Sequence, residues 1–333
     1  MRKVTWLLLG LAVLYSGYWF IAARGSELGV KTWLEARTTE GWQTEYATLE
    51  TRGFPLTFKT TLTDVAIADP ATGLAYQTSK ISIKSRSFTP TRLHAELAQD
   101  VRLSTPFQHI DITNASANGT LFVEVGPALT MHRATFDFDD LIAESTLGWG
   151  FSLDSATATV QRLEDDPLTH DIQMTLNDLA PSTSLMKRLN PNGILSDQFD
   201  ALAIDASMTF DKDWDITALE GPRPQPTHVL LRNMAATWGA LDLRIAGEFE
   251  VDERGVPNGK ISLKATNWRE MIALAAAAGI IPQNFENLAL RGGEMLAKMS
   301  GNANTIDAEL TLSRGNISLG FLPLGPAPRI TIR

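Results

Sequence analysis

The sequence predicts a mainly β protein: amphipathic antiparallel sheets curved into a groove, sandwich or half-barrel, a few short helices, and one N-terminal transmembrane helix. Two observations lead to this prediction. Twenty uncharged residues, Val4 to Ala23, follow Arg2 and Lys3. Beyond the first 45 residues or so, apolar and polar residues alternate in many short segments separated by turn-forming residues. Closely spaced strands with tight turns indicate antiparallel hairpins rather than βαβ units.

The N-terminal apolar segment is long enough to cross a bilayer, because about 20 helical residues span roughly 30 Å. We predict an uncleaved anchor over residues 1–24. Its membrane-contacting residues would be Trp6, Leu7, Leu8, Leu9, Leu11, Val13, Leu14, Tyr18, Trp19, Phe20 and Ile21. The alternative is a cleaved signal peptide, for which Gly25 preceded by Ala23 is the one acceptable small-residue site. Both alternatives place Arg2 and Lys3 in the cytoplasm and the bulk of the chain in the periplasm, at a bacterial inner membrane.

The exported part is predicted to contain two β-rich subdomains. Residues 25–40 have the charge spacing of an amphipathic stalk helix. The first subdomain would cover 41–220 and the second, with two helices, 228–333. The Pro-rich stretch 221–227 would connect them, since it suits neither a helix nor a central strand. The expected helices are 182–189, 268–279 and 284–299.

The clearest alternating segments are predicted strands with one apolar and one polar face. They cover residues 172–177, 204–210, 241–245, 249–252 and 306–312. Turns are expected at Asp69-Pro70, Asn118-Gly119, 255–259 and 314–316. If the sheet is an open groove, its apolar face should include Met174, Met208, Leu243, Phe249 and Leu310.

Composition and spacing argue against most kinds of chemistry. The chain has no cysteine, which excludes thiol nucleophiles, thiolate metal sites and disulfides, and its net charge of −9 makes nucleic acid an improbable partner. No two of its five histidines stand at a metal-ligand spacing. Asp137 and Asp139 would share a strand face, but a solvated face is the better explanation. We therefore expect neither an enzyme nor a cofactor.

Three groups of landmark residues are similar to a known family. They are Tyr15 to Phe20 with Gly41-Trp42 and Arg52-Gly53-Phe54-Pro55, then Gly247 to Trp268, and finally Gly315 to Pro328. Together they resemble the alphaproteobacterial family known as domain of unknown function 2125. The resemblance covers most of the chain and implies no catalytic residues. The strand–helix–strand ending also resembles, more distantly, AsmA-type envelope proteins, whose β-grooves accommodate lipid.

Two functions follow as hypotheses. In the first, a membrane-tethered domain binds or shields lipid in an apolar β-groove. In the alternative, the sheet is fully covered, and the domain is a structural or protein-interaction module of the cell envelope.

Overall fold

The computed structural model describes residues 2–126, 128–190, 193, 195–277, 279, 281, 283–299, 301–320 and 322–332. It confirms the predicted fold class: 52% of the chain is strand, pairing is antiparallel, helices are few, and one long apolar helix stands at the N-terminus. The contacts divide the chain into two compact units. Unit 1 comprises Met1–Phe122 and Ala143–Leu147, and unit 2 comprises Val123–Ile142 and Gly148–Arg333. Each unit is described separately.

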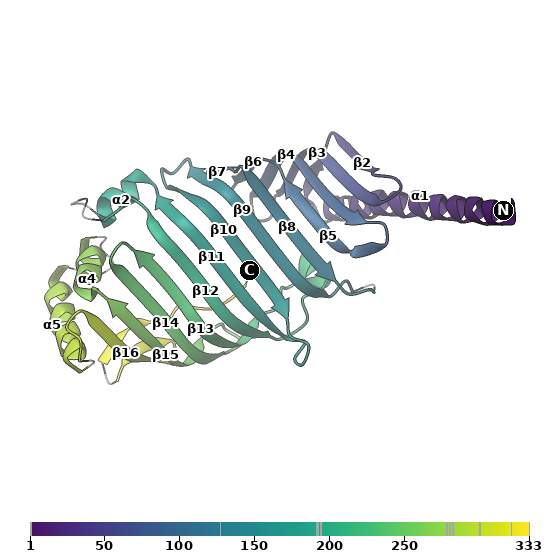
Figure 1. Cartoon of the computed structure of the whole chain (residues 1–333). Helices are drawn as coiled ribbons and strands as arrows, with labels where there is room; N and C mark the ends of the chain where they lie inside the picture. The colour runs from purple at the N-terminus through teal and green to yellow at the C-terminus, as the bar shows by residue number, and fades with distance from the viewer. Residues whose placement is uncertain are drawn as a thin grey trace. The chain divides into compact units, whose positions relative to one another are not determined.

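Unit 1 consists of one long helix and a set of antiparallel strands (Figure 1). Its elements are α1 (Arg2–Thr39), β1 (Gln43–Glu45), β2 (Thr48–Arg52), β3 (Thr57–Asp69), β4 (Leu74–Arg86), β5 (Thr89–Leu97), β6 (Asp100–Ser104), β7 (His109–Thr113) and β8 (Ser116–Val123). Strand β3 pairs with β1, β2 and β4, and β4 pairs in turn with β5 and β6. Two further pairings join β5 to β8 and β6 to β7.

Helix α1 covers the apolar face of these strands. Leu34 packs with Leu62 and Val65, all three at most 6% exposed, and Trp19 stacks on Phe58 with ring centroids 5.5 Å apart. The alternation of β3 places Phe58 and Leu62 on this face, and polar side chains occupy the other. The predicted anchor and the predicted stalk are therefore parts of one unbroken helix, and its second half is a layer of the core rather than a free stalk.

Unit 2 contains the remaining elements, and β9 is shared between the two units. Its strands are β9 (Met131–Ser145), β10 (Gly150–Arg162), β11 (Thr169–Pro181), β12 (Phe199–Phe210), β13 (Pro226–Trp238), β14 (Leu241–Val251), β15 (Pro257–Thr266), β16 (Thr305–Ser313), β17 (Asn316–Leu319) and β18 (Leu322–Pro326). Its helices are α2 (Thr183–Leu189), α3 (Thr217–Glu220), α4 (Trp268–Ala277) and α5 (Gln283–Met299). Strands β10 to β18 pair in chain order, each antiparallel to the next.

Three of the local predictions are corrected. Asn118-Gly119 is not a turn: Gly119 lies within β8, paired with Ala95 of β5. The end of the Pro-rich stretch is strand, because Pro226 opens β13, the place where a missing N–H is tolerated. The predicted strands 241–245 and 249–252 are one strand, β14. The Pro-rich stretch lies inside unit 2, where it leads from α3 into β13.

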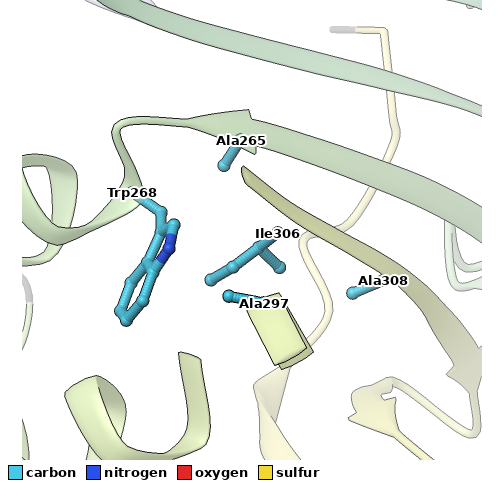
Figure 2. Packing of buried hydrophobic residues seen from close by; sticks show 5 residues of the cluster. All are labelled: Ala265, Trp268, Ala297, Ile306 and Ala308. Atoms are coloured by element: carbon cyan, nitrogen blue, oxygen red, sulfur yellow. The ribbon is translucent and has the colours of Figure 1, made fainter. Parts of the chain in front are cut away.

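Helices α4 and α5 pack on the sheet of unit 2 through a small buried cluster. Trp268 is 1% exposed and lies against Ala265, Ala297 and Ile306 (Figure 2). Its indole Nε1 donates to the carbonyl of Ala303 at 3.1 Å. On α5, Gly293 permits this close approach, because a Cβ there would lie 2.3 Å from the indole ring.

Candidate functional site

The most distinctive surface of the molecule is one face of the unit 2 sheet. The strand registers align its side chains in rows that cross β10 to β16, and these rows contain only apolar residues or glycine. One row is Ala156, Leu176, Leu202, Ala236, Leu243, Ala265 and Ile306; the next is Ala158, Met174, Ile204, Met234, Ile245, Leu263 and Ala308; the third is Val160, Ile172, Ala206, Leu231, Gly247, Ile261 and Leu310. We call this surface the apolar face.

All five residues predicted from the sequence to line a groove lie on the apolar face. Met174, Leu243 and Leu310 belong to the three rows just described. Met208 and Phe249 belong to a fourth row, in which both pair with Val229. All five are half-buried.

The opposite face of the same strands is polar and cross-linked by charge. Arg232 donates to Asp171 at 3.0 Å and also pairs with Asp205, and Lys260 pairs with Glu309 at 2.7 Å. Hydrogen bonds from Ser207 and from Arg232 hold the pKa of Asp171 below its usual value. A sheet with one ionic and one apolar face requires a non-aqueous covering on the apolar side.

The two ends of the apolar face are closed by protein. At one end Met186 of α2 packs with Trp238 and Leu241, next to the Trp268 cluster. At the other end Phe210 contacts Trp214 edge to face at 5.4 Å. The C-terminal tail crosses the strand connections at that same end: Ile330 N donates to Gly255 O at 2.8 Å, and Ile332 N donates to the side chain of Gln225 at 3.0 Å.

Within the described residues of unit 2, the middle of the apolar face has no such cover. Ile172, Met174, Ile204 and Ile245 are half-buried, and Met234 is 40% exposed. Within the described ranges, the buried clusters of unit 2 lie at the helix end and include none of these five. A sheet packed under a second layer would bury such residues almost completely. Among the described residues of unit 2, these five central side chains therefore belong to no buried cluster, whereas the β15 and β16 ends of the same rows pack against α4 and α5.

The comparisons with known proteins establish a family. The model of a family described as "Uncharacterized protein conserved in bacteria (DUF2125)" matches residues 19–328. The chain belongs to the DUF2125 family. Neither the search of curated proteins nor the search of solved structures gave a match. The matched range starts within α1 at Trp19 and includes every strand of both units.

Helix α1 of this DUF2125 protein has a free part and a packed part. Trp6, Leu7, Leu8, Leu9, Leu11, Val13 and Leu14 are all at least 55% exposed, and so are Phe20 and Ile21. Trp19, by contrast, is only 4% exposed and donates from Nε1 to Thr57 O at 3.1 Å. The Tyr18 hydroxyl donates to Ser87 O at 2.8 Å. The helix is long and apolar enough to cross a membrane, and its last predicted anchor residues also contact unit 1.

The remaining candidate groups are dispersed. Asp137 and Asp139 are exposed on β9, and His109 is exposed on β7. Within the described residues, no group of three or more His, Asp or Glu side chains is arranged to hold a metal ion.

His170 stands apart because it is fully buried at the tail end of the apolar face. Its ring contacts Phe210 edge to face at 5.5 Å, and among the described residues neither ring nitrogen has a hydrogen-bond partner in good geometry. Burial lowers the pKa of His170 below 6.5. The folded protein therefore holds a neutral imidazole where an apolar side chain would fit.

This lowered pKa predicts a pH-dependent stability. Below about pH 6.5, His170 binds a proton in the unfolded chain but not in the folded protein. The free energy of unfolding should therefore fall by up to about 1.4 kcal/mol for each unit that the pH decreases. His170→Leu should be at least as stable as the parent at pH 7.5 and should show a shallower decline between pH 6.5 and 5. Urea unfolding at several pH values measures both. Equal slopes for parent and variant would contradict the assignment. Asp171 titrates at lower pH and does not interfere.

Proposed function

We propose that this DUF2125 protein is a membrane-anchored, non-enzymatic protein that binds or shields lipid on the apolar face of unit 2. The observation that supports the proposal is the centre of the apolar face, around Met174, Ile204 and Met234, which no described layer of unit 2 buries. Helix α1 would tether the protein to the bacterial inner membrane, with Arg2 and Lys3 in the cytoplasm and the β units in the periplasm. The alphaproteobacterial origin and the architectural likeness to AsmA-type proteins, both inferred from the sequence, belong to this proposal.

The dimensions of the apolar face suit an acyl chain. Seven strands spaced about 4.8 Å apart make each row roughly 29 Å long. One leaflet of a bilayer core is about half of 30 Å thick, so a row could hold a whole extended acyl chain. Each methylene group taken out of water contributes about 0.8 kcal/mol. Met174 and Met234 adapt their shape to varied ligands, as unbranched side chains with polarisable sulfur do.

The test uses two matched triple variants on the same three strands. Met174→Gln, Ile204→Gln and Met234→Gln make one row of the apolar face polar. Thr175→Gln, Ala203→Gln and Ala235→Gln change the adjacent row on the opposite face. Native mass spectrometry of the full chain extracted in mild detergent should find phospholipid on the parent and on the opposite-face control. The apolar-face variant should remain folded by circular dichroism and should retain at least about tenfold less lipid than the parent. A loss of about 1.4 kcal/mol in binding free energy lowers the affinity tenfold.

Two outcomes would overturn the proposal. If the parent carries no phospholipid, the apolar face does not hold lipid and the proposal fails. If the apolar-face variant unfolds while the control does not, the rows are a covered core. The protein would then be better described as the alternative, a structural or protein-interaction module of the envelope.

A further inference from the structure

The free part of α1 is too short to cross a bilayer by itself. Val4 to Leu14 are exposed all round, and these 11 residues extend about 16 Å at 1.5 Å each. A bilayer core is about 30 Å thick. Roughly the last 14 Å of a spanning helix would have to come from residues 15 to 23, which contact unit 1. The loops of unit 1 that touch this stretch must then lie at the depth of the outer leaflet.

Those loops are the β2–β3 connection and the β4–β5 turn. The Tyr15 hydroxyl donates to Pro55 O at 2.7 Å and lies 2.6 Å from the hydroxyl of Ser87. Ser87 N in turn donates to Leu56 O at 3.0 Å. The two loops are thus held against each other and against α1 in one place.

Large apolar side chains project from both loops. Phe54 is 50% exposed, Leu56 is 62% exposed and Phe88 is 64% exposed. We call these three residues the tip. Phe54 also stacks on Phe20 of α1 at 5.6 Å, so the apolar surface of the tip continues that of the helix. Exposed apolar patches rimmed by polar residues mark sites of contact with a membrane or another molecule.

Basic residues gather beside the tip although the chain as a whole is acidic. Lys84, Arg86 and Arg92, together with His94, line an open hollow of about 1150 Å³ whose rim includes Leu56 and Phe88. Its one carboxylate, Glu96, is paired with Lys59 at 3.4 Å. The Arg92 guanidinium is held over the Phe122 ring at 4.6 Å. Burial and the charges of Arg92, Lys84 and Arg86 keep the pKa of His94 low, as expected in a field of positive charge.

We propose that the tip inserts into the outer leaflet of the membrane that α1 crosses and that the basic hollow faces its anionic headgroups. The inference rests on the membrane anchorage contained in the proposed function and does not depend on lipid binding by unit 2. Apolar side chains at a bilayer surface, flanked by cations, combine burial in the acyl region with attraction to anionic lipid. Unit 1 is thereby held to the bilayer at a second place besides the helix.

The test exploits the absence of cysteine from the sequence. Single cysteines at Phe54, Leu56 or Phe88 of the full chain are labelled with an environment-sensitive fluorophore. The labelled proteins are reconstituted in phosphatidylcholine vesicles with about a quarter phosphatidylglycerol. Leu11→Cys reports on the helix itself. Leu74→Cys is the matched control, because Leu74 is 55% exposed and lies at the opposite end of β4 from Phe88.

Labels at all three tip positions and at Leu11 should shift to shorter emission wavelength and be quenched by lipids that carry nitroxide acyl chains. The Leu74 label should do neither. If Leu11 is quenched while the tip labels behave like Leu74, the insertion of the tip is overturned and the anchorage stands. If none of the labels is quenched, the anchorage fails and the inference fails with it.

Charge-reversal variants test whether the basic hollow faces anionic headgroups. Lys84→Glu, Arg86→Glu and Arg92→Glu, introduced together, should abolish the deeper quenching of the Phe88 label that phosphatidylglycerol produces. The matched control reverses Arg244, Lys260 and Lys264, three exposed cations on the ionic face of unit 2. Equal effects of phosphatidylglycerol on the two triple variants would overturn the assignment of the hollow to anionic headgroups.

Discussion

A chain that starts at Arg24 is expected to be much less stable than a chain that starts at Tyr15. Residues 2–14 are exposed throughout, so their removal costs unit 1 little. Residues 15–23 include buried Trp19 and Ala23, which pack on Phe58. Losing a buried tryptophan alone costs about 3–5 kcal/mol. Urea unfolding of the two truncated chains in the same mild detergent, followed by circular dichroism, should show at least this difference.

The same comparison bears on processing of the N-terminus. A protein cleaved after Gly25 would lack Trp19 and the tyrosine hydrogen bonds to Pro55 and Ser87. If the two truncated chains were equally stable, the contacts of residues 15–23 with the strands would contribute little to stability. That result would favour the cleaved signal peptide. A large difference instead favours a mature protein that keeps its first 24 residues.

Trp268→Ala is expected to have the other large effect. Trp268 is 1% exposed, and its ring fills the space between α4, α5 and the sheet (Figure 2). Truncation should lower the free energy of unfolding by about 3–5 kcal/mol through lost burial and the cavity left behind. Thermal unfolding followed by near-UV circular dichroism measures the change. Met295→Ala is the control, because Met295 lies on α5, which packs against Trp268, yet is 67% exposed and should shift stability by less than about 0.5 kcal/mol. Equal effects of the two substitutions would mean that the cluster does not hold the helices in place.

The sequence predicted the fold class because the strongest strands of unit 2 alternate without interruption. Strand β12 keeps Ile204, Ala206 and Met208 on one side, and the structure places all three on the apolar face. Helices α2, α4 and α5 agree with the predicted ranges to within two residues, since each has a clear apolar pattern or an alanine run.

Strand β13 was missed, and with it part of the candidate site. Its register shifts between Leu231 and Met234, so the alternation of apolar residues breaks in the middle of the strand. This irregularity concealed Met234, which lies next to Ile204 at the centre of the apolar face. Apolar and polar residues alternate on each side of Arg232, and treating the two sides as separate half-strands would have revealed β13.

The alternation of apolar and polar residues could not show whether a sheet face is covered by another layer or left uncovered. Phe58 and Ile204 follow the same alternating pattern, yet Phe58 is 5% exposed under α1 whereas Ile204 is only half-buried. The pattern of one strand records which side is apolar, but the covering layer comes from a segment far away in the chain. The same reason explains the stalk: the charge spacing of residues 25–40 indicated a helix, but it did not indicate that Leu34 packs on Leu62 and Val65.

If α1 crosses a membrane, as proposed above, its unbroken course determines how unit 1 can move there. Sharp bends in helices need a proline or a weak point such as a Gly/Ser pair. Arg2 to Thr39 contain no proline. The two Gly/Ser pairs, Ser16-Gly17 and Gly25-Ser26, each lie between residues that contact the strands or loops of unit 1 on both sides. Helix α1 and the strands of unit 1 thus move together as one rigid body. In a thicker or thinner bilayer the helix adjusts its tilt, and unit 1 would lean with it by the same angle.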